Sequence, residues 1–157
     1  MPKLSRRTNP GVCNCTALRK ASRRVSQMYD AALAPAGLKA TQLAILYEIG
    51  QRAHDPPTMR ELADAMVMDR STLGQNLRPL ERDRLVDWGP SDADRRRKLV
   101  VLTEKGRAKQ MQASSLWRAV QERFESTVGA AEAAHLRGIL FGIAAKSELI
   151  SPAPRSV

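Results

Sequence analysis

Apolar residues recur at steps of three and four positions through most of the chain, which is the spacing of the buried face of a helix. This periodicity is interrupted by short polar segments and by one stretch of extended character. Most of the protein is therefore expected to be α-helical. The pattern predicts helices near residues 16–35, 40–49, 58–66, 69–83, 104–127 and 131–149.

Cap and breaker residues mark where these helices begin and end. The segment APAGL (residues 34–38) places a proline and a glycine after the first helix, and Gly50 is expected to stop the second. Thr58 and Glu61 have the spacing of a capping box, in which each side chain bonds the backbone N–H of the other residue. Asp69 is a favourable cap for the helix after that. The sequence therefore predicts two helices joined by a short turn in the middle of the chain.

A hairpin is predicted directly after these two helices. Residues 85–88 and 98–102 are short, apolar and partly β-branched, which favours strands, and residues 89–94 form the expected turn. Thr103 is placed to cap the long helix that follows. A helix, a turn, a second helix and a hairpin follow one another in the order of a winged helix-turn-helix. The prediction is one domain (1–157), mostly α with a small β-hairpin wing, since no repeat or linker divides the chain.

The first helix has a narrow apolar face. Its members are Leu18, Ala21, Val25, Met28 and Ala32, and basic residues stand between them. A narrow face suits packing against another helix, either of the same chain or of a second one. Before this helix, residues 1–15 are predicted to form a basic, flexible arm.

Composition narrows the classes of partner. The formal net charge is +10, which favours a polyanion or an anionic membrane surface as partner. Aromatic residues make up only 4% of the chain, which argues against rows of rings that stack on single-stranded nucleic acid. No apolar run is long enough to span a bilayer and no signal peptide is recognisable, so a cytoplasmic protein without a membrane partner is expected.

No constellation typical of an enzyme is present. The sequence has no glycine-rich phosphate loop, no paired acids near a histidine and no recognisable Ser/His/Asp arrangement. We therefore predict no catalytic residue, no cofactor and no enzymatic activity. The alternative class that charge leaves open is a sequence-indifferent architectural protein that binds nucleic acid.

The helix that begins at Asp69 carries hydrogen-bonding side chains on its predicted exposed side. A helix fits the major groove of duplex DNA, where arginine suits guanine, Asn and Gln suit adenine, and hydroxyls suit phosphates. A solvated helix face is also polar without any partner, so this segment alone leaves both interpretations open. The candidate DNA-binding residues of this helix are Arg70, Ser71, Thr72, Gln75, Asn76 and Arg78.

A row of cations lies at the tip of the predicted hairpin. Such a row repels itself, but single members can enter a narrow minor groove, where the negative potential is focused. Asp94 precedes Arg96 by two residues and can accept from its guanidinium, which would orient it. The alternative is a turn that only increases solubility. The candidate wing residues are Asp94, Arg95, Arg96, Arg97 and Lys98.

Three segments of the chain resemble the MarR family of bacterial transcriptional regulators. They read GLKATQLAILYEIG, TMRELADAMVMDRSTLGQNLRPLERDRLV and DADRRRKLVVLTEKGR. The most specific part is Asp94-Arg95-Arg96 followed by Leu102-Thr103 and Gly106. The resemblance covers nearly the whole chain, and the order and spacing of its pieces carry more weight than any single piece.

The resemblance implies a homodimer in which different segments of the chain form the dimer interface and bind DNA. Residues 16–35 and 104–150 would form the dimerisation helices, and residues 40–103 the winged helix-turn-helix lobe that binds DNA. The helix at 69–83 would enter the major groove at each half of a pseudopalindromic operator, and Arg96, oriented by Asp94, would enter the minor groove. Members of the family are commonly repressors that an oxidant or a small molecule releases from DNA. One departure is Lys39, where the family often has a hydroxyl or similar cap.

Two cysteines are candidates for an oxidant signal. Cys13 and Cys15 are too close for an unstrained internal disulfide, so oxidation would more readily bridge to another subunit or to a small thiol. The helix N-terminus and nearby Arg19 and Lys20 are expected to lower the thiol pKa. The alternative is that both are incidental free thiols. A metal site is disfavoured, because the only histidines, His54 and His135, lie far from the cysteines in the sequence.

An organic effector is the alternative signal. The resemblance implies a pocket between the dimerisation helices and the DNA-binding lobe. Candidate lining residues are Met28, Leu46, Trp117 and Phe124, although packing in the core explains these residues equally well.

Overall fold

The computed structural model describes residues 13–90 and 98–147. The predicted arm up to residue 12 and most of the predicted turn therefore lie outside the described residues. The elements are α1 (Asn14–Leu33), the 3-10 turn η2 (Ala34–Ala36), α2 (Ala40–Gln51), α3 (Met59–Ala65), α4 (Arg70–Arg82), β1 (Val86–Pro90), β2 (Lys98–Leu102), α5 (Glu104–Val128) and α6 (Ala130–Ala144). The mostly helical fold with a two-stranded antiparallel hairpin confirms the predicted fold class.

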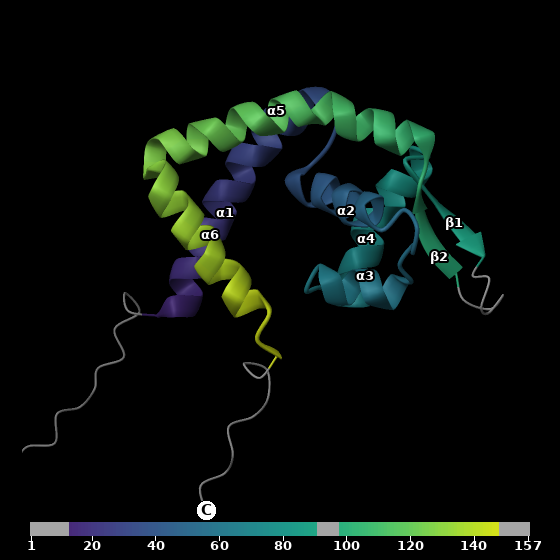
Figure 1. Ribbon diagram of the computed structural model, residues 1–157, viewed down its shortest axis with the longest axis horizontal. Helices are drawn as coiled ribbons and strands as arrows, with labels where there is room; N and C mark the ends of the chain where they lie inside the picture. The colour runs from purple at the N-terminus through teal and green to yellow at the C-terminus, as the bar shows by residue number, and fades with distance from the viewer. Residues whose placement is uncertain (1–12, 91–97, 148–157) are drawn as a thin grey trace, which may run out of the picture.

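Helix α5 connects two groups of elements (Figure 1). At its C-terminal end α1 and α6 pack against it, and at its N-terminal end lie α2, α3, α4 and the hairpin. The two groups are joined a second time by the short segment between α1 and α2. None of the helices in the described ranges has the length and apolarity needed to cross a bilayer.

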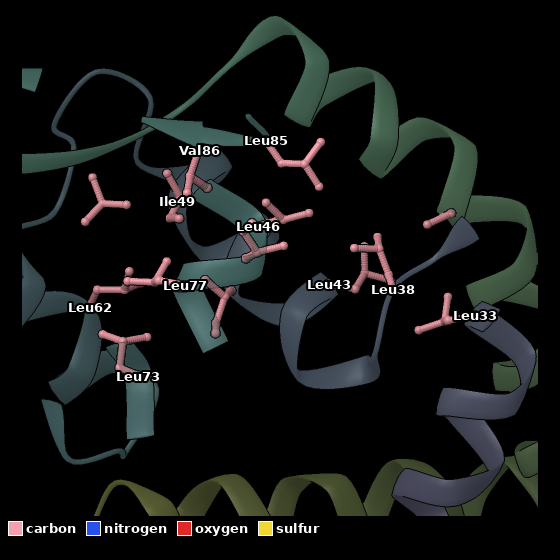
Figure 2. Packing of buried hydrophobic residues seen from close by; sticks show 14 of the residues in the cluster. Leu33, Leu38, Leu43, Leu46, Ile49, Leu62, Leu73, Leu77, Leu85 and Val86 are labelled. Carbon is pink, nitrogen blue, oxygen red and sulfur yellow. The ribbon is translucent and has the colours of Figure 1, made fainter. Parts of the chain in front are cut away.

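The second group is built around a leucine-rich core (Figure 2). Helical periodicity predicts an inward face on each of α2 and α4, and all of its members are buried: Leu43, Leu46, Ile49, Leu73, Leu77 and Leu80. Leu46 and Leu73 are 0% exposed. Burying a leucine side chain contributes about 1.5–3 kcal/mol to stability, so these positions hold the helices together. The labelled members of this core are Leu33, Leu38, Leu43, Leu46, Ile49, Leu62, Leu73, Leu77, Leu85 and Val86.

The prediction that Gly50 stops the second helix is wrong. Helix α2 continues through Gly50 to Gln51. A Cβ atom at Gly50 would lie 3.1 Å from Nε2 of Gln110 and 3.3 Å from Cδ2 of Leu102. The glycine therefore serves the close approach of α2 to α5 and β2, which a local sequence pattern does not reveal.

The first strand of the hairpin begins one residue later than predicted and ends two residues later, at Pro90. β1 and β2 pair antiparallel from Val86↔Leu102 to Pro90↔Lys98, so Gly89 lies in a strand and not in the turn. The backbone N–H of Val100 also donates to the carbonyl of Pro57 at 2.8 Å. This bond holds the hairpin against the segment that precedes α3.

The ends of the long helices differ from the predictions. Helix α1 begins at Asn14, because the carbonyl of Cys13 already accepts the first helical hydrogen bond from Ala17 at 3.0 Å; residues 14 and 15 are therefore helical and not part of an arm. Helix α6 ends at Ala144, before the predicted residue 149. In α5 the apolar pattern of Met111, Leu116, Val120 and Phe124 predicts a buried face, but Met111 is 70% exposed.

Candidate nucleic-acid interface

Helix α3 begins with the capping box that the sequence predicted. The backbone N–H of Thr58 donates to Oε2 of Glu61 at 2.7 Å, and the N–H of Glu61 donates to Oγ1 of Thr58 at 3.3 Å. The helix ends after Ala65, and Val67 then adopts a left-handed conformation with φ of 52°. This residue turns the chain sharply, so that α4 starts at a large change of direction and packs on α3.

Asp69 caps the N-terminus of α4. Its Oδ1 accepts from the backbone N–H of Thr72 at 2.7 Å, and its Oδ2 accepts from the hydroxyl of Thr72 at 2.7 Å. The hydrogen bond from the Thr72 backbone is the largest cause that holds the pKa of Asp69 below its usual value, and the Thr72 hydroxyl is the next. The first turn of α4 is thus fixed in an exposed position, as the candidate interface requires.

The pH dependence of stability tests this cap. Because the folded protein holds the pKa of Asp69 below that of the unfolded chain, the stabilising contribution is present above about pH 4 and is lost as the pH falls through the folded pKa. We expect the wild-type protein to be more stable than Asp69→Ala at pH 7, and the difference to shrink below about pH 4. Urea unfolding of both proteins from pH 7 to pH 3 measures it. A difference that does not change with pH would mean that the carboxylate charge plays no part.

The exposed side of α4 carries the six residues that the sequence proposed. Arg70, Ser71, Gln75 and Arg78 are exposed, and their side chains make no hydrogen bond or ion pair with another described residue. The other two have partners within the helix. The Thr72 hydroxyl is held by Asp69, and Nδ2 of Asn76 donates to the carbonyl of Thr72 at 2.9 Å.

The hairpin is fixed to the C-terminal end of α4 by side chains that sequence reasoning had not identified. Nε1 of Trp88 on β1 donates to Oε1 of Glu81 on α4 at 3.0 Å. Nζ of Lys105 donates to the carbonyl of Asp83 at 2.8 Å, and the hydroxyl of Thr103 donates to the carbonyl of Arg84 at 2.8 Å. These bonds set the direction of the hairpin relative to α4.

Only one of the proposed wing residues belongs to the described part of the chain. Lys98 is exposed and is the first residue of β2, where it pairs with Pro90. Asp94, Arg95, Arg96 and Arg97 lie outside the described residues. β1 ends at Pro90 and β2 begins at Lys98, at the end of the hairpin that points away from α5 (Figure 1).

The two cysteines lie at the start of α1. Both are free and exposed, and Cys13 is the cap residue of the helix. A hydrogen bond from the Thr16 hydroxyl is the largest cause that lowers the pKa of the Cys13 thiol; the Thr16 backbone adds to it, and the charge of Arg19 contributes least. The sequence had predicted a lowered pKa from the helix N-terminus, Arg19 and Lys20; the Thr16 backbone N–H and Arg19 do contribute, but the Thr16 hydroxyl was not foreseen. In residues 13–90 and 98–147 no group of three or more His, Cys, Asp and Glu side chains could hold a metal ion.

The cavities only partly match the predicted effector pocket. A cavity of about 360 Å³ lies where the pocket was expected, between α1, α2 and α4, and Asp30, Lys39 and Gln42 are among its lining residues. Of the four candidate residues, Met28 and Phe124 line a different groove, between α1 and α5. Leu46 is fully buried in the core and Trp117 is 41% exposed.

Comparison with known proteins gives the same assignment. The family model described as MarR family matches residues 36–97. The M. tuberculosis transcriptional regulator MosR in complex with DNA is 36% identical, with 89% of this chain and 99% of that chain covered and a TM-score of 0.77. MosR crystallised without DNA is also 36% identical, with 85% and 96% covered and a TM-score of 0.71. CouR from Rhodococcus jostii RHA1 bound to p-coumaroyl-CoA is 24% identical, with 89% and 97% covered and a TM-score of 0.74, and shows the shared fold.

No curated protein matches the chain significantly. The similarity to MosR covers most of this chain and nearly all of MosR. The family model spans the segment from η2 through α4 and β1. The capped helices α3 and α4 have the order of a helix-turn-helix, and the hairpin follows them in the chain. The chain therefore belongs to the MarR family of DNA-binding transcriptional regulators.

Proposed function

We propose that the protein is a homodimeric repressor that reads a pseudopalindromic operator with α4 and releases it in response to a signal. The observation that carries this proposal is the exposed, capped N-terminal half of α4, whose arginine, serine and glutamine side chains are available to base edges and phosphates. The proposed major-groove residues are Arg70, Ser71, Thr72, Gln75, Asn76 and Arg78. The proposed wing residues are Asp94, Arg95, Arg96, Arg97 and Lys98.

Support for a dimer comes from the apolar surface of α6. The side chain of Phe141 is 69% exposed, and four further large apolar residues of this helix are exposed by 39% or more. A groove of about 520 Å³ runs between α6, α1 and α5 and is lined largely by apolar side chains. Exposed apolar surface of this extent marks an interaction site, and a second copy related by two-fold symmetry would bury it. We therefore propose that α1, α5 and α6 form the dimerisation region.

Specific binding is tested with the DNA that flanks the gene itself. We expect an inverted repeat there to be bound about a thousandfold or more tighter than a random duplex at the same salt concentration. Affinity should also fall with salt, with about one unit of log–log slope for each phosphate contacted. Equal affinity for both duplexes would favour the architectural alternative. We propose that the protein acts on DNA in the cytoplasm and without catalysis of its own.

Cys13 and Cys15 are the proposed site of an oxidant signal. The lowered pKa of the Cys13 thiol raises the fraction present as thiolate, which is the form that peroxide oxidises. Attack of the thiolate on peroxide gives a sulfenic acid and hydroxide, and a second thiol then displaces water to form a disulfide. Because Cys15 lies in the helix two positions away, the second thiol is proposed to come from another subunit or a small thiol.

Replacing both cysteines tests this signal. We expect Cys13→Ser/Cys15→Ser protein to bind the operator normally and to stay bound when peroxide is added, while the wild-type protein is released. Non-reducing electrophoresis of the treated wild-type protein should show a disulfide-linked species. If peroxide releases the double variant as readily as the parent, the thiols are not the sensor, and an organic ligand in the cavity beside Asp30 becomes the favoured signal.

A further inference from the structure

The segment between α1 and α2 joins the proposed dimerisation helices to the DNA-binding lobe. It is short and tightly packed, since Leu33, Ala36 and Leu38 are all buried. Within it Gly37 adopts a left-handed conformation with φ of 68°, and its N–H donates to the carbonyl of Ala34 at 2.9 Å. The segment is therefore a fixed joint and not a free linker.

The first turn of α2 lacks a cap of its own. Lys39 stands at the cap position, and a lysine side chain has no acceptor to offer the free N–H groups of the helix. Oε1 of Gln42 accepts from the N–H of Lys39 at 2.9 Å, which satisfies one of these groups. The N–H of Ala40 donates instead to Oδ1 of Asp30, at 2.7 Å, and Asp30 belongs to α1.

A side chain of α5 also bonds the segment between α1 and α2. Nζ of Lys109 donates to the carbonyl of Ala36 at 3.2 Å. Both contacts thus run from helices of the proposed dimerisation region to the backbone at the entrance of the lobe. The orientation of α2 relative to α1 depends on them, in addition to the buried leucines.

The orientation of α2 also determines the orientation of α4, because the two helices pack in one core. Leu46 and Ile49 of α2 lie in the same core as Leu73 and Leu77 of α4, and the two helices are in contact (Figure 2). A closely packed core moves as one body. A change at the Asp30 contact would therefore rotate the surface of α4 relative to the dimerisation helices.

We propose that Asp30 is a positioning residue for operator binding: by capping α2 from α1, it fixes the separation and angle of the two α4 helices in the dimer. This inference rests on the proposed dimeric function. Two half-sites on B-form DNA are about 34–36 Å apart, so a dimer binds both only when its reading helices match that spacing. A loosened joint leaves each lobe folded but populates the matching arrangement less often, which weakens binding to the whole operator.

The test compares Asp30→Ala with Asp30→Asn on a full operator and on a duplex that contains one half-site. Asparagine keeps the Oδ1 acceptor, and alanine removes it. We expect Asp30→Ala to weaken full-operator binding about fivefold to tenfold, the effect of losing a helix cap, and to leave half-site binding unchanged. Asp30→Asn should bind both duplexes as the wild-type protein does. Asp55→Ala is the matched control, because Asp55 is an exposed aspartate just after α2 whose side chain pairs locally with Arg52 at 3.6 Å.

A distance measurement provides a second readout. Spin labels on Gln51→Cys, an exposed position at the end of α2, in a background without the native cysteines, report the separation of the two lobes by pulsed electron paramagnetic resonance. We expect a broader distance distribution for Asp30→Ala and an unchanged one for Asp30→Asn. The proposal is overturned if Asp30→Ala loses full-site and half-site affinity equally, or if its affinity and distances match those of Asp55→Ala. Failure of the proposed function itself would already be visible in the wild-type protein, as a monomer in sedimentation equilibrium or as equal binding to operator and random DNA.

Discussion

Gly106→Ala is expected to lower the free energy of unfolding by about 3 kcal/mol, at the upper end of the usual range for overpacking. A Cβ atom at Gly106 would overlap the carbonyl oxygen of Leu85 and would lie 2.6 Å from Cδ1 of Leu102. The Leu85 carbonyl cannot withdraw easily, because it accepts from the N–H of Thr103 at 3.2 Å and from its hydroxyl at 3.1 Å. Either the first turn of α5 or the start of the hairpin must move, and both changes break the attachment of the wing.

Urea unfolding at one fixed protein concentration measures this loss, since the stability of a dimer depends on concentration. Gly74→Ala is the matched control: it lies inside α4, and its added Cβ would meet only Cε of Met59, at an ordinary 3.6 Å. The control is expected to gain up to about 1 kcal/mol from the higher helix propensity of alanine. A Gly106→Ala protein with the unfolding midpoint of the wild type would contradict the close approach of α5 to Leu85, the residue before β1.

Arg96→Ala is expected to raise the Kd for the operator about five- to 150-fold, which corresponds to about 1–3 kcal/mol. The expectation comes from the sequence motif, because Arg96 lies outside the described residues, and from the attachment of the hairpin to α4 through Trp88 and Glu81. That attachment fixes the direction of β1 relative to α4. An arginine at the tip of the hairpin can then enter the minor groove while α4 occupies the major groove.

The loss of operator affinity in Arg96→Ala must exceed the loss caused by removing one positive charge elsewhere on the protein. Arg118→Ala removes the same charge from an exposed position on α5, distant in sequence from the proposed interface, and is expected to change the Kd little. Titration of both variants against operator and random duplex at one salt concentration separates the two effects. Equal Kd values for the two variants on the operator would remove Arg96 from the interface.

The positions of the helices were predictable because their signals are local. Thr58, Asp69 and Thr103 each cap a helix through a bond to the residue three positions later. The inward-facing leucines of α2 and α4 followed from helical periodicity in the same way. A pattern that repeats within one or two turns does not depend on the rest of the fold.

Glycines were harder to interpret, because glycine serves both local and distant purposes. Gly50 was predicted to end a helix, whereas α2 continues through it and the side chain is absent because α5 and β2 approach closely. Gly106 belongs to the recognised motif, but its reason, the carbonyl of Leu85, became visible only in three dimensions. Gly37 was predicted as a breaker and adopts the left-handed conformation that favours glycine.

In the candidate site, the exposed residues of α4 were predictable and their partners were not. Amphipathic periodicity indicated which side of α4 faces outward. It did not indicate that Asn76 donates to the carbonyl of Thr72, or that Trp88 reaches Glu81. The position of these side chains depends on rotamers and on neighbours from other elements.

The sequence alone determined the class of fold, the order of its elements, the family and the polar side of α4, because periodicity, caps and turn residues act over a few positions. The tertiary structure decided how the two groups of elements are joined. The cap that Asp30 of α1 gives to α2, and the approach of Gly106 of α5 to Leu85, both join residues that are ten or more positions apart. Such contacts exist only after the helices have packed, and no local pattern encodes which of the available polar groups will meet.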